Sequence, residues 1–226
     1  YHNPKDPASI SNNKIWSIYE DRAGIIWYAT DNGVNLLDQH QEEFVFYPVH
    51  YTIEGQSVGI QINAILPYEL DGYWLASQQG VIKYSTSRGI IMKFGHKPND
   101  PLSLLADRTR DIYLDEFGKL WIATNKGVNV WDPVPSRMYS FPANFGSGVG
   151  LKSQFTSSLV RSKDGNLWVS TWDGGLHKAI GDLSDINSIN FKQINTLSTG
   201  GIVSSPEAIW VNKNRELYRI DLLTHQ

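Results

Sequence analysis

One stretch of about 24 residues recurs four times along this chain of 226 residues, and it constrains the fold more than any other feature. The copies occupy residues 15–38, 62–85, 109–132 and 156–179. Each copy holds a tryptophan 47 residues after the previous one, at Trp27, Trp74, Trp121 and Trp168. A fifth, divergent copy is centred on Trp210, 42 residues further on. The chain is therefore interpreted as a repeat protein.

Each copy alternates short apolar runs with turn residues, which is the pattern of β-strands and not of helices. In the first repeat we expect four strands, at Ile15–Glu20, Ile25–Thr30, Val34–Leu37 and Glu43–Val49. Asp31-Asn32-Gly33 is typical of a tight hairpin between the second and third of these strands. Each repeat is then a four-stranded antiparallel meander of about 45 residues.

A single four-stranded sheet has too little core to be stable alone. Stacking equivalent sheets around an axis buries both faces, so the period predicts an all-β fold, a β-propeller of four-stranded antiparallel blades. We expect the repeated tryptophans to pack between neighbouring blades. A hydroxyl three residues after each tryptophan is expected to satisfy backbone groups near the turn, at Thr30, Ser77, Thr124 and Thr171. A glycine follows six residues after each tryptophan, at Gly33, Gly80, Gly127 and Gly174.

The repeats predict about five consecutive blades. Tyr1–Ser11 resembles Phe94–Leu104, which follows the expected outer strand Ile90–Phe94, so the chain is expected to begin within a repeat. The unit on Trp210 has no room for an outer strand. We predict a single propeller segment over residues 1–226, part of a larger, seven-bladed propeller, with a closed five-bladed ring as the alternative. The longest connections between blades are Tyr51–Gln61 and Pro142–Gln154.

Composition argues against several classes of protein. The net charge of −3 and the lack of a basic stripe disfavour a nucleic-acid partner. No run of about 18 apolar residues is present, so we expect no direct membrane insertion by this segment. The six histidines show no metal-ligand spacing, and no nucleophile or phosphate-binding motif occurs. We expect no metal, no cofactor and no catalytic residue in this region.

The pattern I-x-x-[IL]-x-x-D-x-x-G-x-[IL]-W-x-x-T-x-x-G-[VL] resembles the two-component regulator propeller repeat. The first and third copies match it best, at Asp21, Gly24, Trp27, Thr30 and Gly33 and at Asp115, Gly118, Trp121, Thr124 and Gly127. The second copy has Tyr68 and the fourth has Ser162 in place of the aspartate. The linker pattern N-P-x-D-P-x-S-[IL]-S is also typical of this family.

The resemblance implies the periplasmic sensor part of an inner-membrane hybrid two-component histidine kinase, and a carbohydrate as the signal. The partners it implies are a small-molecule or oligosaccharide ligand and other blades or domains of the same receptor; a homodimer is possible as well. Two other functions stay open. One is a protein-interaction or dimerisation propeller that senses nothing, and the other is a propeller polysaccharide lyase or hydrolase.

Ligands of propellers commonly bind at one rim, where the linkers entering each blade meet the turns between second and third strands. On this rim we expect the ligand-binding side chains to be Trp16, Asn63, Arg108, Arg110, Trp172 and Asp173. Nearby polar positions are Asn12, Asn13, Gln61 and Gln154. Aromatic faces pack on the C–H faces of sugar rings, while amides and arginine fix hydroxyls or carboxylates. The set therefore suits hydroxylated or acidic sugars.

Overall fold

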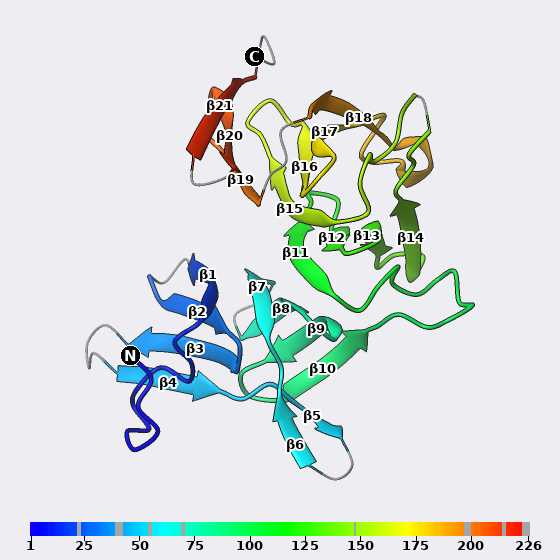
Figure 1. The fold of residues 1–226 in the computed structure, drawn as a ribbon. Coiled ribbons are helices and arrows are strands. Elements are labelled where there is room, and N and C mark those ends of the chain that lie inside the picture. The colour runs from blue at the N-terminus through cyan, green and yellow to red at the C-terminus, as the bar shows by residue number, and fades with distance from the viewer. Residues whose placement is uncertain are drawn as a thin grey trace. The chain divides into compact units, whose positions relative to one another are not determined.

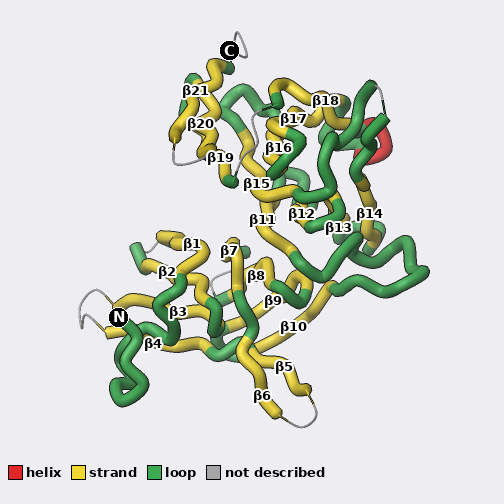
Figure 2. The backbone as a smooth tube through the Cα atoms, viewed as in Figure 1, coloured by secondary structure: helices red, strands yellow, loops and turns green. Residues whose placement is uncertain are grey.

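A computed structural model describes most of the chain, and it forms two compact units. Unit 1 comprises Tyr1–Gly95 with Asp107–Thr109, and unit 2 comprises His96–Ala106 with Arg110–Gln226. The described residues are 1–21, 24–38, 43–53, 56–68, 71–146, 148–196, 200–213 and 216–222. Within them the regular secondary structure is all β apart from one short 3-10 helix at Ile186–Ser188 (Figure 2). The predicted fold class is confirmed.

Unit 1 contains two antiparallel four-stranded sheets (Figure 1). Blade 1 consists of β1 (Ile15–Glu20), β2 (Ile26–Thr30), β3 (Gly33–Asp38) and β4 (Glu43–Tyr47). Blade 2 consists of β7 (Ile62–Pro67), β8 (Gly72–Ser77), β9 (Gly80–Ser85) and β10 (Gly89–Phe94). The connection between them forms a separate hairpin of β5 (His50–Ile53) and β6 (Gln56–Gly59), where the sequence had suggested only a linker.

Unit 2 contains two further four-stranded sheets and one of three strands. Blade 3 consists of β11 (Thr109–Leu114), β12 (Leu120–Thr124), β13 (Gly127–Asp132) and β14 (Arg137–Pro142). Blade 4 consists of β15 (Thr156–Arg161), β16 (Leu167–Thr171), β17 (Gly175–Ile180) and β18 (Asn190–Asn195). Blade 5 consists of β19 (Gly201–Ser204), β20 (Ala208–Lys213) and β21 (Glu216–Asp221). The meanders match the predicted repeats, while the span of a single propeller over residues 1–226 stays a prediction.

The tryptophans of blades 1, 3 and 4 lie buried between neighbouring blades of the same unit, as predicted, and Trp74 of blade 2 is buried as well. In unit 1 the ring of Trp27 on blade 1 contacts that of Tyr73 on blade 2, with centroids 4.3 Å apart. Burial raises the pKa of Tyr73 to about 12, which fits an interface between blades that excludes water. We call the interface between two neighbouring blades a seam. In unit 2, Trp121 packs in one core with residues of blade 4 such as Leu159, and Trp168 packs against Ile209 of blade 5. These indoles stabilise the seams by burying large apolar surfaces.

The spacing between the turn aspartate and the tryptophan recurs between repeats for a direct physical reason. The Trp27 Nε1 donates a hydrogen bond to Asp21 Oδ2 at 3.0 Å, and the Trp121 Nε1 donates to Asp115 Oδ2 at 2.8 Å. In blade 4 the acceptor is the hydroxyl of Ser162, 2.8 Å from the Nε1 of Trp168. A buried indole N–H needs an acceptor, so these turn residues belong to the fold.

The hydroxyls after each tryptophan close the hairpin between second and third strands, as predicted. The hydroxyl of each residue donates to the carbonyl of the turn glycine: Thr30 to Gly33, Ser77 to Gly80, Thr124 to Gly127 and Thr171 to Gly175. In blade 4 the glycine is therefore Gly175 and not Gly174. This turn holds one residue more than the others, so Gly174, six residues after Trp168, lies one position before the glycine that pairs with Thr171.

Candidate functional site

Three of the predicted ligand-binding residues occupy one repeat position on the innermost strand. The pairing of β1 with β2 shifts register at Trp16, and that of β7 with β8 shifts at Asn63. Ser157 holds the same place in blade 4, and Arg110 stands at the corresponding position of blade 3, 47 residues from each neighbour. A β-bulge redirects a side chain. The repeat thus offers one variable rim position per blade, and the four residues differ in what they contact.

Trp16 is part of a cluster contained within blade 1. Its Nε1 donates to Asp31 Oδ1 at 2.5 Å, and Lys14 Nζ lies 4.3 Å from the centroid of its ring. Lys14 Nζ also pairs with Asp31 Oδ2 at 3.4 Å. The indole N–H and both charges are therefore satisfied by one another, although 39% of Trp16 is exposed.

Asn63 is buried, and its amide joins β7 to Thr109, which belongs to the same unit. It accepts a hydrogen bond from Gln61 Nε2 at 2.7 Å and donates through Nδ2 to the carbonyl of Thr109 at 2.6 Å. The Thr109 hydroxyl in turn donates to the carbonyl of Ser77 at 2.9 Å. Asn63 and Gln61 thus hold the scaffold, and Arg108 lies exposed directly before Thr109. The predicted Asn12 and Asn13 also serve backbone groups, those of Lys14 and His2.

Arg110 and Trp172, predicted separately from blades 3 and 4, lie together in unit 2. The guanidinium carbon of Arg110 is 5.2 Å from the centroid of the Trp172 ring, a cation–π arrangement across the seam. Arg110 Nε also donates to Asn125 Oδ1 in the turn after β12, at 3.4 Å. Trp172 is 54% exposed, on the turn that is one residue longer than its counterparts.

Asp173 stands beside this pair and is held by the linker that enters blade 4. The hydroxyl of Ser153 donates a short hydrogen bond to Asp173 Oδ1 and accepts one from the backbone N–H of Phe155 at 3.0 Å. The backbone N–H of Trp172 donates to the carbonyl of Phe155 at 3.0 Å. Linker and turn are thus locked to each other, and Phe155 stays exposed next to Trp172.

Sequence reasoning missed Ser153, Phe155 and Asn125, which shape this rim. Asn125 was recognisable only as a turn residue, and Ser153 sits in a Gly/Ser-rich linker where serines attract no notice. Phe155 directly precedes β15, and its exposure could not be read from the strand pattern. Gln154, which was predicted, lies exposed between the two linker residues.

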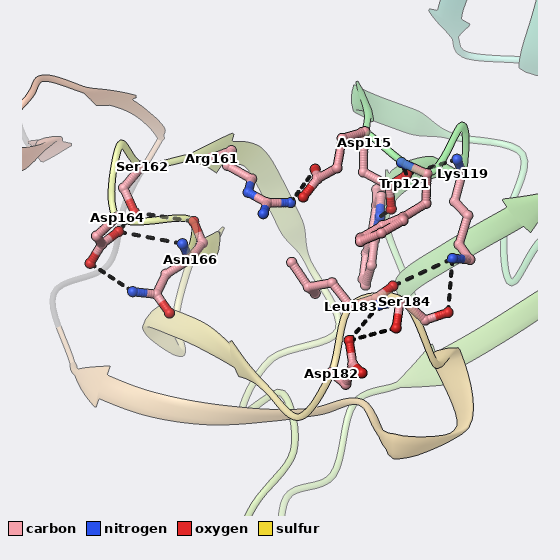
Figure 3. A network of polar contacts seen from close by, with 12 residues as sticks. Asp115, Lys119, Trp121, Arg161, Ser162, Asp164, Asn166, Asp182, Leu183 and Ser184 are labelled. Carbon is pink, nitrogen blue, oxygen red and sulfur yellow. Dashed lines mark hydrogen bonds and ion pairs between the residues drawn. The ribbon is translucent and has the colours of Figure 1, made fainter.

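A polar network at the other end of the strands ties blade 3 to blade 4 (Figure 3). Lys119 Nζ donates to the backbone carbonyls of Leu183 at 3.5 Å and Ser184 at 3.0 Å. Arg161 Nη1 pairs with Glu116 Oε2 at 2.5 Å. These groups are mutually satisfied, so we assign them to the seam and not to a binding site.

The same seam contains a buried carboxyl on the inner strands. Asp111 Oδ2 accepts hydrogen bonds from the hydroxyl of Ser158 and the backbone N–H of Leu159, each at 2.8 Å. Burial raises the pKa of the Asp111 carboxyl.

Among the residues that the structure describes, no group of histidine, aspartate and glutamate side chains could hold a metal ion. In the same residues no helix is long and apolar enough to cross a bilayer.

Two segments of the chain match the model of the family described as two component regulator propeller, residues 9–32 and 150–173. They belong to blades 1 and 4, whereas the motif comparison placed the best matches in the first and third repeats. Each segment runs from the linker that enters a blade to the turn after its second strand. The exposed tryptophans Trp16 and Trp172 both lie within these segments.

Solved structures share this fold. The chain is 20% identical to the extracellular domain of a B. thetaiotaomicron protein assigned as a hybrid two component system, with a TM-score of 0.75 over 100% of this chain and 30% of that one. A second such domain from the same organism is 23% identical, with a TM-score of 0.71 over 96% of this chain and 30% of that one. The chain thus spans about a third or less of the length of these domains.

A more distant likeness joins the chain to an enzyme. Virginiamycin B lyase from Staphylococcus aureus is 15% identical, with a TM-score of 0.63 over 92% of this chain and 67% of that one. At such identity the likeness concerns the fold alone. No curated protein matches the chain.

Proposed function

We propose that this chain, which carries two component regulator propeller repeats, is the extracytoplasmic ligand-sensing propeller region of a hybrid two-component sensor. In this proposal it lies in the periplasm, performs no catalysis itself and responds to a carbohydrate. The similarity in fold to extracellular domains of such systems supports the sensor role and the location outside the cytoplasm.

The observation that carries the ligand proposal is the contact between Arg110 of blade 3 and Trp172 of blade 4. An exposed indole suits the apolar C–H face of a sugar ring, and a guanidinium beside it suits hydroxyl or acidic groups. Asp173, fixed by Ser153, adds an acceptor for sugar hydroxyls at the same rim. A ligand bound here would touch two blades at once.

Calorimetry of the 226-residue chain against a panel of oligosaccharides tests this function. We expect at least one member to bind, and W172A to weaken that binding by about 10-fold or more through the loss of ring stacking. F117A is the matched control, because Phe117 is also exposed beneath a cation, Lys119, but lies at the other end of blade 3. If no oligosaccharide of the panel binds, the carbohydrate ligand is contradicted. If F117A weakens binding as much as W172A does, the site at Trp172 is contradicted.

A protein-interaction role is the second candidate, favoured by a different surface. The outer strand β10 of blade 2 exposes three consecutive apolar residues, Ile90, Ile91 and Met92. Exposed apolar residues on an edge strand favour association. Sedimentation of the chain and of I91K distinguishes the roles: ligand-independent association that I91K abolishes supports an interaction propeller.

A further inference from the structure

Cationic side chains and a carboxylate lie on the segments that form the rim of blades 3 and 4. Arg110, Lys126 and Lys152 are cations in this part of unit 2, while Asp173 supplies a carboxylate. Lys126 is exposed and adjoins Asn125, the residue that accepts from Arg110. Lys152 Nζ donates to the backbone carbonyls of Asn144 and Gly146. Among the described residues, neither lysine pairs with a carboxylate.

Within this rim Arg110 has a defined orientation. Its Nε donates to Asn125, and its guanidinium carbon lies over the ring of Trp172, 5.2 Å from the centroid. Contacts to an amide in one turn and an indole in the next restrict the position of the guanidinium before any ligand arrives. A planar guanidinium recognises a carboxylate or sulfate through paired hydrogen bonds, and pre-orientation lowers the entropy lost on binding.

We propose that this rim selects sugars that bear an acidic group, and that Arg110 is the residue that determines this selectivity. The inference rests on the proposed carbohydrate ligand and adds its charge class. The sugar ring stacks on the exposed indole of Trp172, and its carboxylate or sulfate accepts hydrogen bonds from Arg110. Asp173 accepts from ring hydroxyls, because the hydroxyl of Ser153 holds its carboxylate in place.

Two matched pairs of ligands test the charge class on the intact chain by calorimetry. The first pair is an oligogalacturonate and its methyl ester, in which a neutral ester replaces each charged carboxylate. The second pair is a sulfated disaccharide and its desulfated form. We expect the acidic member of one pair to bind about 10- to 100-fold more tightly than its neutral partner, the range of a charged hydrogen bond. That preference should shrink as salt is added.

The R110Q variant tests the assignment to one residue, because glutamine keeps a polar amide near Asn125 but removes the charge. R110Q should lose the preference for the acidic member, so that the two members of a pair bind R110Q with nearly equal affinity. R137Q is the matched control: Arg137 lies over Tyr139 at the same 5.2 Å, but on the outer strand of blade 3. R137Q should keep the preference.

The outcomes separate the two proposals. Neutral members that bind as tightly as acidic ones overturn the acidic selectivity while the carbohydrate function stands. A preference that survives in R110Q overturns the role of Arg110. If no carbohydrate of any charge binds, the proposed function fails and this inference fails with it.

Discussion

Blades 1 and 4 begin from the same repeat, yet their rims differ. Both match the family model, and both expose a tryptophan beneath a cation. In blade 1 the cation and the acceptor come from the same blade, so Lys14, Trp16 and Asp31 satisfy one another. In blade 4 the cation comes from blade 3, and the turn bearing Trp172 is one residue longer. A cluster closed within one blade stabilises that blade, whereas one assembled across a seam can hold a ligand.

The linkers that enter these blades are also anchored differently. In blade 1, Asn35 Oδ1 accepts from the backbone N–H of Ser11 at 2.8 Å. Blade 4 has His177 at this position, and its Nε2 accepts from the backbone N–H of Lys152 at 3.0 Å. Histidine replaces an amide whose charge never changes with a ring that titrates. The anchor beside the candidate site is therefore sensitive to acid, and the one in blade 1 is not.

The largest effect we predict is an acid-induced loss of stability caused by His177. Burial lowers the pKa of His177 to about 4, against 6.5 in an unfolded chain. As the pH falls through this window, the unfolded state gains a proton that the folded state does not, so the free energy of unfolding decreases. The loss reaches up to about 3 kcal/mol at pH 4, or about 1.4 kcal/mol per pH unit. Above pH 6.5 the effect vanishes.

Urea denaturation at pH 7.5, 5.5 and 4 checks this expectation, with H177N as the decisive variant. Asparagine restores the anchor of blade 1 and removes the titrating group, so H177N should lose less stability in acid than the parent chain. H2N is the control, because it makes the same substitution at an exposed histidine. If the free energy of unfolding of H177N equals that of the parent chain at all three pH values, the acid sensitivity does not come from His177.

A second difference concerns the acceptor of the buried indole. Asp21 in blade 1 accepts from Trp27 Nε1 and from the backbone N–H of Ile25, both at 3.0 Å. Ser162 in blade 4 offers Trp168 a neutral hydroxyl. We expect D21A to cost about 1.5–3 kcal/mol and S162A about 0.5–1.5 kcal/mol, since hydrogen bonds to charged groups are the stronger. Denaturation midpoints of the two variants at pH 7.5 measure both; a larger loss in S162A would reverse the ranking.

The fold was predictable because it depends on residues that recur. A tryptophan, its acceptor, a hydroxyl and a turn glycine must keep fixed spacing to close each hairpin and fill each seam, so four copies reveal the pattern. The longer turn at Trp172 was not predicted, because Gly174 and Gly175 are adjacent and the spacing from Trp168 points to Gly174 as the turn glycine. The β5–β6 hairpin escaped because a short connection with polar residues and glycine gives little strand signal.

The candidate site was less predictable, for the opposite reason. Binding residues occupy the positions that do not recur, so no period identifies them. Reasoning from topology placed Trp16, Asn63 and Arg110 on one rim, but only the structure shows that the Asn63 amide contacts Gln61 and Thr109 while Arg110 contacts Trp172. Contacts across a seam depend on rotamers of residues far apart in sequence.

The smallest effect we predict concerns the blade 1 cluster of Lys14, Trp16 and Asp31. It tests whether these side chains serve the stability of the blade and bind no ligand. Lys14 is mostly exposed, so its ion pair with Asp31 and its contact with Trp16 together should contribute about 0.2–1 kcal/mol. K14Q should therefore lower the free energy of unfolding by no more than this, and added salt should reduce the difference from the parent chain. Urea denaturation at low and high salt gives both values, with K5Q as the control because Lys5 is an exposed lysine of the same N-terminal segment. If K14Q instead leaves stability unchanged and alters oligosaccharide binding, the blade 1 cluster is a second ligand site and the contrast between the two rims disappears.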